Sequence, residues 1–331
     1  MSLVAVDWGT SALRGALLDD HGRVLEQMSS GQGILQVPKD EFATVFEANF
    51  AHWTSATGQF YSKSSPQALI SGMAGSQQGW TEAPYCPCPA GFDDLAERLA
   101  WVQPRRIAIV PGLCCEHDGV PDVMRGEEVQ IFGALQLLGL QDAHIVLPGT
   151  HSKWASVRAG RILHFRSFMT GEFFALLRQH SILSRTLPGP SQPNDRHASD
   201  VNEVSDTGAA RAQEALDLAA FDDGIAHALR SKSLLNTAFS ARTLALFKRK
   251  TPAELLSYLS GLVIGEELRA QDLSALGEVI VIGSEALTTR YARALNQAGA
   301  QVRCVGAEAT WRGLWAVSQA LARPGTHAGA H

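Results

Sequence analysis

Residues 147–154, LPGTHSKW, combine residue types that can hold a phosphate. Glycine lets a backbone approach an anion closely, and successive N–H groups of a turn can point at it. Hydroxyls add hydrogen-bond donors, and a lysine adds a positive charge. The candidates are Gly149, Thr150, His151, Ser152 and Lys153. An ordinary hairpin turn would explain the same residues, so this motif alone leaves both interpretations open.

A second Gly-Thr turn, preceded by a carboxylate, lies near the start of the chain. In DWGTS, Gly9, Thr10 and Ser11 repeat the pattern, and Asp7 stands where the other turn has Leu147. A carboxylate at the end of a strand can bind Mg²⁺ directly or through water. One turn would then hold the metal side and the other a phosphate of the same nucleotide. The alternative for Asp7 is a residue that caps its own turn.

Two adjacent acidic residues follow a glycine in MRGEEVQIFGAL, residues 124–135. Phosphoryl transfer to a hydroxyl needs positioning, electrostatics and one base for the nucleophile. Glu127 or Glu128 could be that base, and we prefer Glu127 because it directly follows the glycine. Arg125 could pair with a substrate carboxylate. Acidic residues are also common in the first turn of a helix because of the helix dipole.

Two further stretches could contact a small polar ligand. GSQQGW, residues 75–80, offers two amides, two glycines and an aromatic face, which suits a polyol or sugar acid. The candidates there are Gln77, Gln78, Gly79 and Trp80. In VIVIGSEAL, Gly283 and Ser284 form a turn between a predicted strand and helix, which can hold a purine or its ribose. A packed loop and an ordinary βα crossover are the competing interpretations.

Other chemistries fit less well. His151 and Ser152 are sequence neighbours, which point to opposite faces of a strand, so they make a poor Ser–His pair. Cysteine spacing is unusual for zinc, which favours reduced thiols at Cys86, Cys88, Cys114 and Cys115. A net charge of −5 without any Lys/Arg run argues against nucleic acid. No apolar run approaches the roughly 20 residues that span a bilayer. The start of the chain resembles a strand, not a signal peptide, so a cytoplasmic location is expected.

Both phosphate turns are expected between strands. Residues 3–28 and 144–168 each show strand, turn, strand, turn, strand, which is an internal repeat separated by about 140 residues. The repeat predicts two related domains that face each other. Apolar spacing predicts helices, among others, over 42–54, 128–138, 207–219, 222–230, 253–271 and 310–322. The stretch 111–126 is expected to contain the hinge.

Several motifs together resemble a known superfamily. VAVDWGTSALRGALLD is similar to the first phosphate motif of the actin, Hsp70 and sugar-kinase superfamily, VLPGTHSKW to its second, and VIVIGSEAL to its adenosine motif. More narrowly, DWGTS…LR, GMAGSQQGWTEAPY, PDVMRGEEVQIFGAL, LPGTHSKW, SFMTGEFFALL and GLVIGEEL together resemble the 2-dehydro-3-deoxygalactonokinase family, from residue 3 to about 320.

This resemblance implies an α/β fold of two actin-like (ribonuclease H-like) domains, each a mixed sheet flanked by helices. We expect domains at 1–115 and 116–331, with the last helix able to pack back and a disordered tail at 324–331. It implies ATP and Mg²⁺ as cofactors and phosphorylation of 2-dehydro-3-deoxy-D-galactonate at its 6-hydroxyl, in galactonate catabolism. Asp7 would bind the metal, the two turns the phosphates, and Gly283 and Ser284 the adenosine. Arg14 joins Gln77, Gln78, Gly79, Trp80 and Arg125 as substrate-binding candidates.

Three alternatives stay open at this stage. The substrate could be the gluconate epimer, because epimer choice rests on one or two hydrogen bonds. The chain could be a nucleotide- or sugar-binding regulator without transfer, although no DNA-binding helix-turn-helix is appended. It could also be a nucleotide hydrolase or a chaperone-type ATPase, although no substrate-binding β domain, as the chaperone form would need, follows residue 320. The expected partner is a small sugar acid, and the sequence does not fix the oligomeric state, for which a homodimer is one option.

Overall fold

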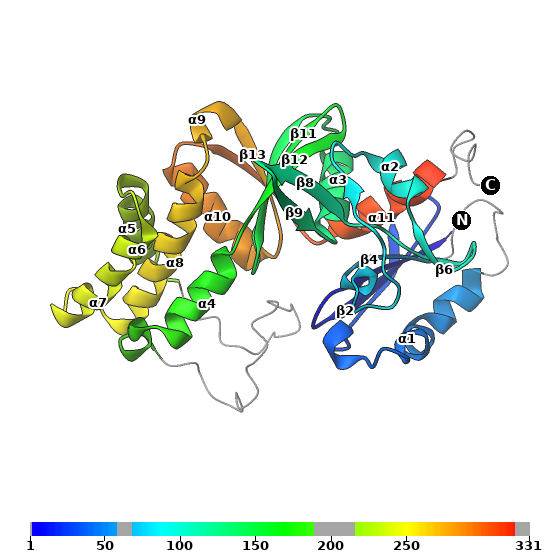
Figure 1. Ribbon diagram of the computed structural model, residues 1–331, viewed down its shortest axis with the longest axis horizontal. Coiled ribbons are helices and arrows are strands. Elements are labelled where there is room, and N and C mark those ends of the chain that lie inside the picture. The colour runs from blue at the N-terminus through cyan, green and yellow to red at the C-terminus, as the bar shows by residue number, and fades with distance from the viewer. Residues whose placement is uncertain (1, 58–67, 189–215, 322–331) are drawn as a thin grey trace.

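The protein has two lobes, each built on one β-sheet (Figure 1). The computed structural model describes residues 2–57, 68–188 and 216–321. The N-terminal sheet has the order β3-β2-β1-β4-β7-β6, formed by Val24–Ser30, Leu13–Leu18, Leu3–Trp8, Ala68–Gly72, Ile107–Ile109 and Ala100–Gln103. The C-terminal sheet has the order β12-β11-β10-β13-β14, formed by Arg161–Phe168, Ser152–Arg158, Ala143–Leu147, Glu278–Ile282 and Gln301–Val305.

The two sheets share one topology. In the first, β1 pairs antiparallel with β2 and parallel with β4, and β3 and β7 extend the sheet to either side. In the second, β10 pairs antiparallel with β11 and parallel with β13, and β12 and β14 extend it. This duplication confirms the predicted actin-like α/β fold. It also places each Gly-Thr turn between the first two strands of its sheet.

Helices cover both faces of each sheet. The alternation of side chains along β1 sends Val4 and Val6 towards α1 (Phe42–Thr57) and Leu3 and Ala5 towards α11 (Glu308–Leu321). The core that contains Leu3 continues through α3 (Glu127–Leu138) to the C-terminal sheet. The two sheets are therefore joined by one apolar core that includes α3 and α11.

Close helix crossings depend on glycine at two places. A Cβ at Gly133 in α3 would lie 1.7 Å from the carbonyl oxygen of Ala309, and one at Gly313 in α11 would lie 1.9 Å from that of Val129. Beyond the C-terminal sheet, α5 (Leu218–Arg230) crosses α8 (Pro252–Arg269) through glycines in the same way. The remaining helices are α2 (Phe92–Glu97), α4 (Thr170–His180), α6 (Leu234–Thr237), α7 (Phe239–Leu246), α9 (Leu273–Leu276) and α10 (Glu285–Gln297).

Several expectations differ from the structure, stay untested or fall outside the described residues. The stretch expected to be a hinge contains an antiparallel hairpin, β8 (Leu113–His117) and β9 (Val120–Met124), with β5 (Cys86–Pro87) beside β8. The expected domain boundary at 115/116 falls within β8, and the division itself stays a prediction. Asp217 caps α5 by accepting from the Ala220 N–H at 2.8 Å, so the helix starts at Leu218 and the predicted break after 219 is wrong. Most of the predicted helix at 207–219 and the tail at 324–331 lie outside the described residues.

Candidate active site

Asp7 lies where two parallel strands end together. The register of β1 and β4 places Asp7 beside Ser71 and Trp8 beside Gly72. Gly72 has a φ of 89°, and a Cβ there would lie 2.8 Å from the carbonyl oxygen of Trp8 and 3.2 Å from Asp7 Oδ1. Only glycine therefore fits beside this carboxylate. Arg14, the cross-strand partner of Asp7 on β2, donates a hydrogen bond to Asp7 Oδ2.

The first turn of α3 meets the same edge of the N-terminal sheet. Gly126 has a φ of 106°, and a Cβ on it would lie 3.3 Å from the Cα of Gly72. This contact seats the start of α3 against the end of β4. The contact brings Glu127 and Glu128 of α3 to the sheet edge that carries Asp7, although Asp7 lies about 120 positions earlier in the sequence.

The two glutamates of α3 have different surroundings. Glu128 is fully buried, and both of its carboxylate oxygens accept from the Gly126 N–H, at 2.7 and 3.0 Å. Burial, helped by the charge of Glu127, raises the pKa of Glu128 to about 8. Glu127 is half-buried and accepts from the Arg125 N–H at 2.9 Å. Burial also raises the pKa of Glu127; the positive charge of Lys153 opposes this rise and Asp7 adds to it. The pKa of Glu127 therefore depends on charged groups beside both Gly-Thr turns, Asp7 and Lys153.

The first Gly-Thr turn is supported by the segment after β3. The backbone N–H groups of Ile34 and Leu35 donate to the carbonyl oxygens of Gly9 and Thr10, at 3.0 and 3.1 Å. A Cβ on Gly33 would lie 2.2 Å from the carbonyl carbon of Ser11, so this segment packs directly on the turn.

The second Gly-Thr turn is supported in the equivalent way, by the segment after β12. A Cβ on Gly171, at the start of α4, would lie 2.5 Å from the carbonyl oxygen of Gly149. The Glu172 N–H donates to the carbonyl oxygen of Thr150 at 3.1 Å, and the Glu172 carboxylate lies 2.6 Å from His151 Nε2. In both turns, a segment that contains a glycine packs against the turn backbone, with Gly33 at the first turn and Gly171 at the second.

Ser152 and Lys153 point to opposite faces of β11. The Ser152 hydroxyl is buried and donates to Glu267 Oε1 at 2.8 Å, so a contact of Ser152 with a phosphate would use its backbone. Lys153 is 6 % exposed, and its Nζ donates to Ser167 Oγ at 2.6 Å. The Ser167 hydroxyl donates in turn to Asp122 Oδ1 at 2.6 Å. The chain Lys153–Ser167–Asp122 fixes the lysine on the face that influences Glu127.

Arg125 has unused donors beside the GSQQGW loop. Its Nη2 donates to the carbonyl oxygen of Ala83 at 2.8 Å, and its guanidinium lies 4.4 Å from the centre of the Tyr85 ring. Its Nε and Nη1 are buried and have no hydrogen-bond partner among the described residues, and the same holds for Ser76 Oγ. A Cβ on Gly75 would lie 2.7 Å from Arg125 Nη1, which places the guanidinium against this loop. Buried donors without partners fit a carboxylate that arrives with the ligand.

The other predicted ligand contacts in this loop divide into two kinds. Gln77 and Gln78 are exposed, as expected of residues that reach a substrate. Gly79 is buried, and a Cβ there would lie 2.3 Å from the carbonyl oxygen of Ala74, so packing alone requires glycine. Trp80 packs edge-on against Trp8, with ring centres 6.0 Å apart, and is partly buried.

The Gly283–Ser284 turn has space on its open side. A Cβ on Gly283 would have its nearest neighbour at 3.9 Å, so packing within the protein does not require glycine there. Ser284 is the N-cap residue of α10, yet its buried hydroxyl has no hydrogen-bond partner in the described part of the chain. A glycine that the fold does not need, followed by an unpaired hydroxyl, fits a ligand such as adenosine.

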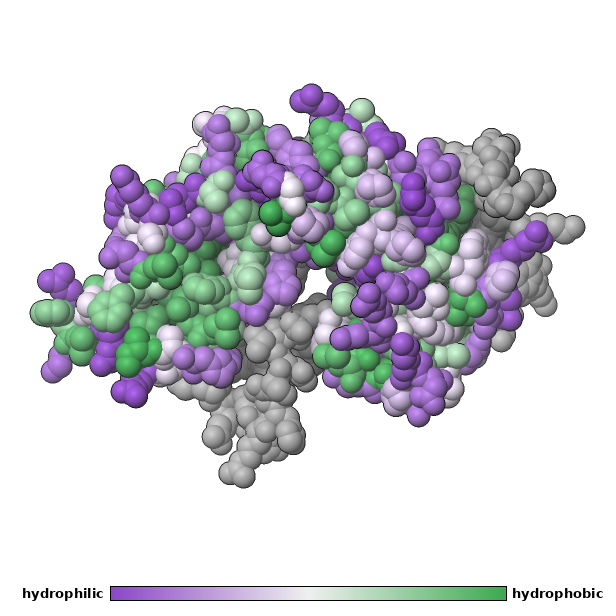
Figure 2. All heavy atoms as spheres, in the orientation of Figure 1, coloured by the Kyte–Doolittle hydropathy of each residue, from purple (hydrophilic) through white to green (hydrophobic). Residues whose placement is uncertain are grey.

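Figure 2 shows an opening between the two lobes.

Comparison with known proteins identifies the family. The profile of the 2-keto-3-deoxy-galactonokinase family matches residues 7–317. The chain belongs to this family. It is 36 % identical over 324 residues to "Probable 2-dehydro-3-deoxygalactonokinase DgoK1" of Rhizobium meliloti (strain 1021), covering 96 % of each chain. It is 31 % identical over 323 residues to the 2-dehydro-3-deoxygalactonokinase of Escherichia coli (strain K12), covering 96 % of this chain and 98 % of that one.

A crystal structure from Sinorhizobium meliloti, described as that of a 2-dehydro-3-deoxygalactonokinase protein, is also similar. Its TM-score is 0.78 at 33 % sequence identity, with 96 % of this chain and 98 % of that chain covered. The match to the galactonokinase family thus extends over sequence and structure alike. Within the described residues, no helix is both long and apolar enough to cross a membrane.

Cys86, Cys88, Cys114 and Cys115 carry free thiols. No group of three or more His, Cys, Asp or Glu side chains in residues 2–57, 68–188 and 216–321 is arranged to hold a metal ion. Burial raises the pKa of the Cys88 thiol to about 12, which keeps it protonated at neutral pH.

Sequence reasoning missed Asp122, Ser167 and Glu267 as parts of the site. Two of them were visible only as members of longer motifs, in PDVMRGEE and SFMTGEF, and Glu267 as part of GLVIGEEL. Their contacts join residues far apart in the chain, so no local spacing rule singles them out.

Proposed function

We propose that the protein is an ATP-dependent kinase that phosphorylates 2-dehydro-3-deoxy-D-galactonate on its 6-hydroxyl. The products are ADP and 2-dehydro-3-deoxy-6-phosphogalactonate. Family membership supports the substrate and the reaction. The residues of the two lobes support phosphoryl transfer in particular.

One observation carries the proposal. Asp7 and Glu127 lie at the same edge of the N-terminal sheet, and the charge of Lys153, from the other lobe, lowers the pKa of Glu127. A metal-binding carboxylate, a base and a phosphate turn are the parts that phosphoryl transfer needs. A regulator that only binds nucleotide would have no use for a partly accessible carboxylate with a raised pKa between its two phosphate turns.

The phosphates of ATP are assigned to the two supported turns. Gly9, Thr10 and Ser11 are assigned to phosphate on the Asp7 side, and Gly149, Thr150 and His151 on the other, because a glycine lets the backbone of each turn approach an anion closely. The Gly9 N–H itself donates within its turn, to the carbonyl oxygen of Ala12 at 2.9 Å. Mg²⁺ is assigned to Asp7 and would neutralise charge on the phosphates; one carboxylate with phosphate oxygens is a usual ligand set for this ion. Gly283 and Ser284 are assigned to adenosine.

Glu127 is assigned the role of base. The oxygen of the 6-hydroxyl forms a bond to the γ-phosphorus as the bond to ADP breaks, and Glu127 takes the hydroxyl proton. A raised pKa makes this carboxylate a stronger base. Glu128 is fully buried and has no exposed oxygen for a substrate, so we assign it to support of the helix start.

Recognition of the sugar acid is assigned to Arg125 and the GSQQGW loop. The free Nε and Nη1 of Arg125 suit a carboxylate, and the hydroxyl of Ser76 and the amides of Gln77 and Gln78 suit the polyol chain. Trp80 offers the part of its ring that packing leaves open. Arg14 would act through its hydrogen bond to Asp7.

Binding between two lobes also suggests closure. We propose domains at 1–115 and 116–331 that close over ATP and the sugar acid, which would exclude water and limit futile hydrolysis of ATP. Both substrates are small metabolites, which favours a cytoplasmic enzyme without nucleic-acid or membrane partners. A homodimer remains one option for its oligomeric state.

The test is a coupled assay of ADP release with Mg·ATP and 2-dehydro-3-deoxy-D-galactonate. The gluconate epimer and a no-sugar reaction run beside it, and Asp7→Ala and Glu127→Gln serve as variants. We expect release that depends on the galactonate derivative and falls by about 10²- to 10⁴-fold in Glu127→Gln. Preference for the epimer would correct the substrate. Full activity of Glu127→Gln would rule out Glu127 as the base, and no sugar-dependent release with either acid would overturn the proposal.

A further inference from the structure

Glu267 of α8 is a buried carboxylate that the proposed reaction does not use. It is 3 % exposed and lies near the C-terminal end of a helix whose other buried residues are mostly apolar. Its pKa is raised by burial, although hydrogen bonds from four side chains oppose the rise. A group that is costly to bury calls for an account of what it holds in place.

Four donors, from three different elements, point at this carboxylate. Oε1 accepts from Ser152 Oγ at 2.8 Å and from Trp154 Nε1 at 2.6 Å. Oε2 accepts from the Tyr291 hydroxyl at 2.7 Å and from Thr170 Oγ1. Each carboxylate oxygen thus accepts two hydrogen bonds, which is the number that its two lone pairs allow.

The elements that supply these donors are the ones assigned to the nucleotide. Ser152 begins β11, directly after the second phosphate turn. Thr170 begins α4 and precedes Gly171, which packs on that turn. Tyr291 lies on α10, two turns after the Gly283–Ser284 turn. One carboxylate therefore joins the phosphate turn, its support and the adenosine helix.

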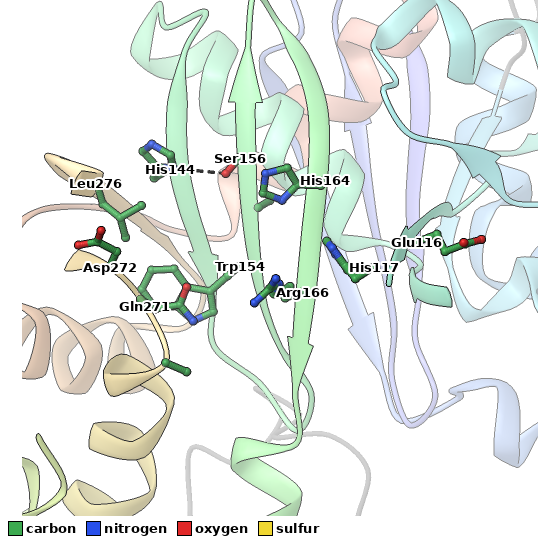
Figure 3. A pocket seen from close by; sticks show the side chains of 12 residues that line it. Glu116, His117, His144, Trp154, Ser156, His164, Arg166, Gln271, Asp272 and Leu276 are labelled. Atoms are coloured by element: carbon green, nitrogen blue, oxygen red, sulfur yellow. Dashed lines mark hydrogen bonds between the residues drawn. The ribbon is translucent and has the colours of Figure 1, made fainter. Parts of the chain in front are cut away.

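The same contacts also orient Lys153. Because Ser152 and Trp154 lie two residues apart on β11, they share the face that meets Glu267, and Lys153 must point to the opposite face. The Trp154 side chain also lines a hollow of about 500 Å³, near His164 and Arg166 (Figure 3). The hollow is lined by none of the predicted site residues, and the indole N–H is satisfied by Glu267.

We infer that Glu267 is a positioning residue for ATP: it fixes the second phosphate turn and the adenosine helix relative to each other. It touches no substrate itself. The inference rests on the proposed assignment of ATP to these two turns. It predicts that loss of its hydrogen bonds weakens nucleotide binding and leaves sugar-acid binding unchanged, since none of the four donors to Glu267 comes from Arg125 or residues 75–80.

A matched pair of tyrosines tests this. Tyr291→Phe removes the hydroxyl bound to Glu267. Tyr258→Phe removes a hydroxyl on α8 that contacts His227 and Ser240, from a residue that is 3 % exposed against 2 % for Tyr291. Calorimetric titration of each variant with ADP gives a dissociation constant that does not depend on catalysis. We expect Tyr291→Phe to weaken ADP binding and to raise the KM for ATP by about tenfold, which corresponds to one hydrogen bond to a carboxylate. The KM for the sugar acid should stay unchanged. Tyr258→Phe should lower thermal stability but leave both constants unchanged.

Substitution of Glu267 separates position from charge. In Glu267→Gln the amide oxygen can still accept from Ser152 and Trp154, while the amide N–H groups can donate to Thr170 and Tyr291 after their hydroxyls reverse. We expect ADP affinity within about threefold of wild type for Gln and a loss of more than tenfold for Glu267→Leu. If Glu267→Leu does not fold, the Tyr291 comparison still decides.

Three results would overturn the inference. They are unchanged ADP affinity in Tyr291→Phe, equal weakening in the two tyrosine variants, and Glu267→Gln as weak as Glu267→Leu. Failure of the proposed function looks different: the wild type would then release no ADP with the sugar acid, while ADP binding would still depend on Tyr291.

Discussion

Glu128→Gln should make the stability of the protein less dependent on pH. The Glu128 carboxyl has a pKa of about 8 in the folded protein because it is buried beside Glu127, against an ordinary value of 4.5. A pKa raised by folding means that the neutral carboxyl is the form the fold tolerates. The contribution of the neutral Glu128 carboxyl to stability is therefore fully present below pH 4.5 and is lost progressively as the pH rises towards 8.

The size of the effect follows from the pKa shift. One pKa unit corresponds to about 1.4 kcal/mol, so roughly 1 kcal/mol of unfolding free energy is lost by pH 5 and roughly 3 kcal/mol by pH 7. By about pH 8.5 the loss is roughly 5 kcal/mol, because the carboxyl is then largely ionised in the folded protein. Glutamine does not ionise, so its effect on the free energy of unfolding is the same at every pH. It costs about 1 to 3 kcal/mol, because its amide N–H₂ lies beside the Gly126 N–H and two donors cannot pair.

The measurement is urea unfolding of wild type and Glu128→Gln at about pH 5 and about pH 8.5. We expect the stability difference between the two proteins to shift by roughly 4 kcal/mol in favour of glutamine between these pH values. The constant cost of the amide cancels in this comparison. Glu41→Gln, at an exposed glutamate directly before α1, is the control for the substitution itself. A stability difference that is the same at both pH values would refute the account of Glu128 as a neutral buried acid.

Three further substitutions separate folding from ligand binding. Asp7→Asn should keep a hydrogen bond to Arg14 and remain folded, yet lower kcat by about 10²-fold or more and weaken the dependence on Mg²⁺, as measured by ADP release across a magnesium titration. Arg125→Met should raise the KM for the sugar acid by about 100-fold and leave the KM for ATP unchanged in steady-state kinetics, because its free donors would meet only the acid. Gly283→Ala should keep the thermal midpoint of wild type, since its Cβ has room, and weaken ADP binding in calorimetry, whereas Gly171→Ala should impair both because its Cβ would meet Gly149 at 2.5 Å. Equal effects of the two alanine variants would contradict this distinction.

The sequence was most informative where chemistry and local geometry coincide. Each Gly-Thr turn lies between two short apolar strands that pair antiparallel, so the repeat of residues 3–28 and 144–168 predicted the duplicated sheets. Glu127 and Glu128 follow a glycine whose positive φ ends one strand and opens a helix, which the letters RGEE already indicated. These features depend on near neighbours, and near neighbours are what sequence patterns record.

Features that depend on distant contacts were not predictable. Ser152 resembles a phosphate ligand in GTHSK, but its hydroxyl is directed to Glu267, more than a hundred residues away. The hairpin β8–β9 was not recognised within the stretch expected to contain the hinge, because its strands, LCCEH and VPDVM, lack the apolar alternation that identifies a strand. The roles of Asp122 and Ser167 emerge only when β9 and β12 lie side by side. In each case the partner is set by tertiary packing, which local propensity does not encode.

The position of α11 has a consequence for how this chain is made. The face of the first sheet that carries Leu3 and Ala5 packs with Trp311, Leu314 and Val317, which are among the last described residues to leave the ribosome. At typical synthesis rates, roughly 10 to 40 s separate the completion of β7 from the appearance of α11. During that interval the nascent N-terminal lobe has an incomplete apolar face, covered only in part by α2 and α3. Folding of this lobe is therefore completed only after residues 308–321 have been synthesised, and a ribosome stalled before residue 308 would present an unfinished core to chaperones and proteases.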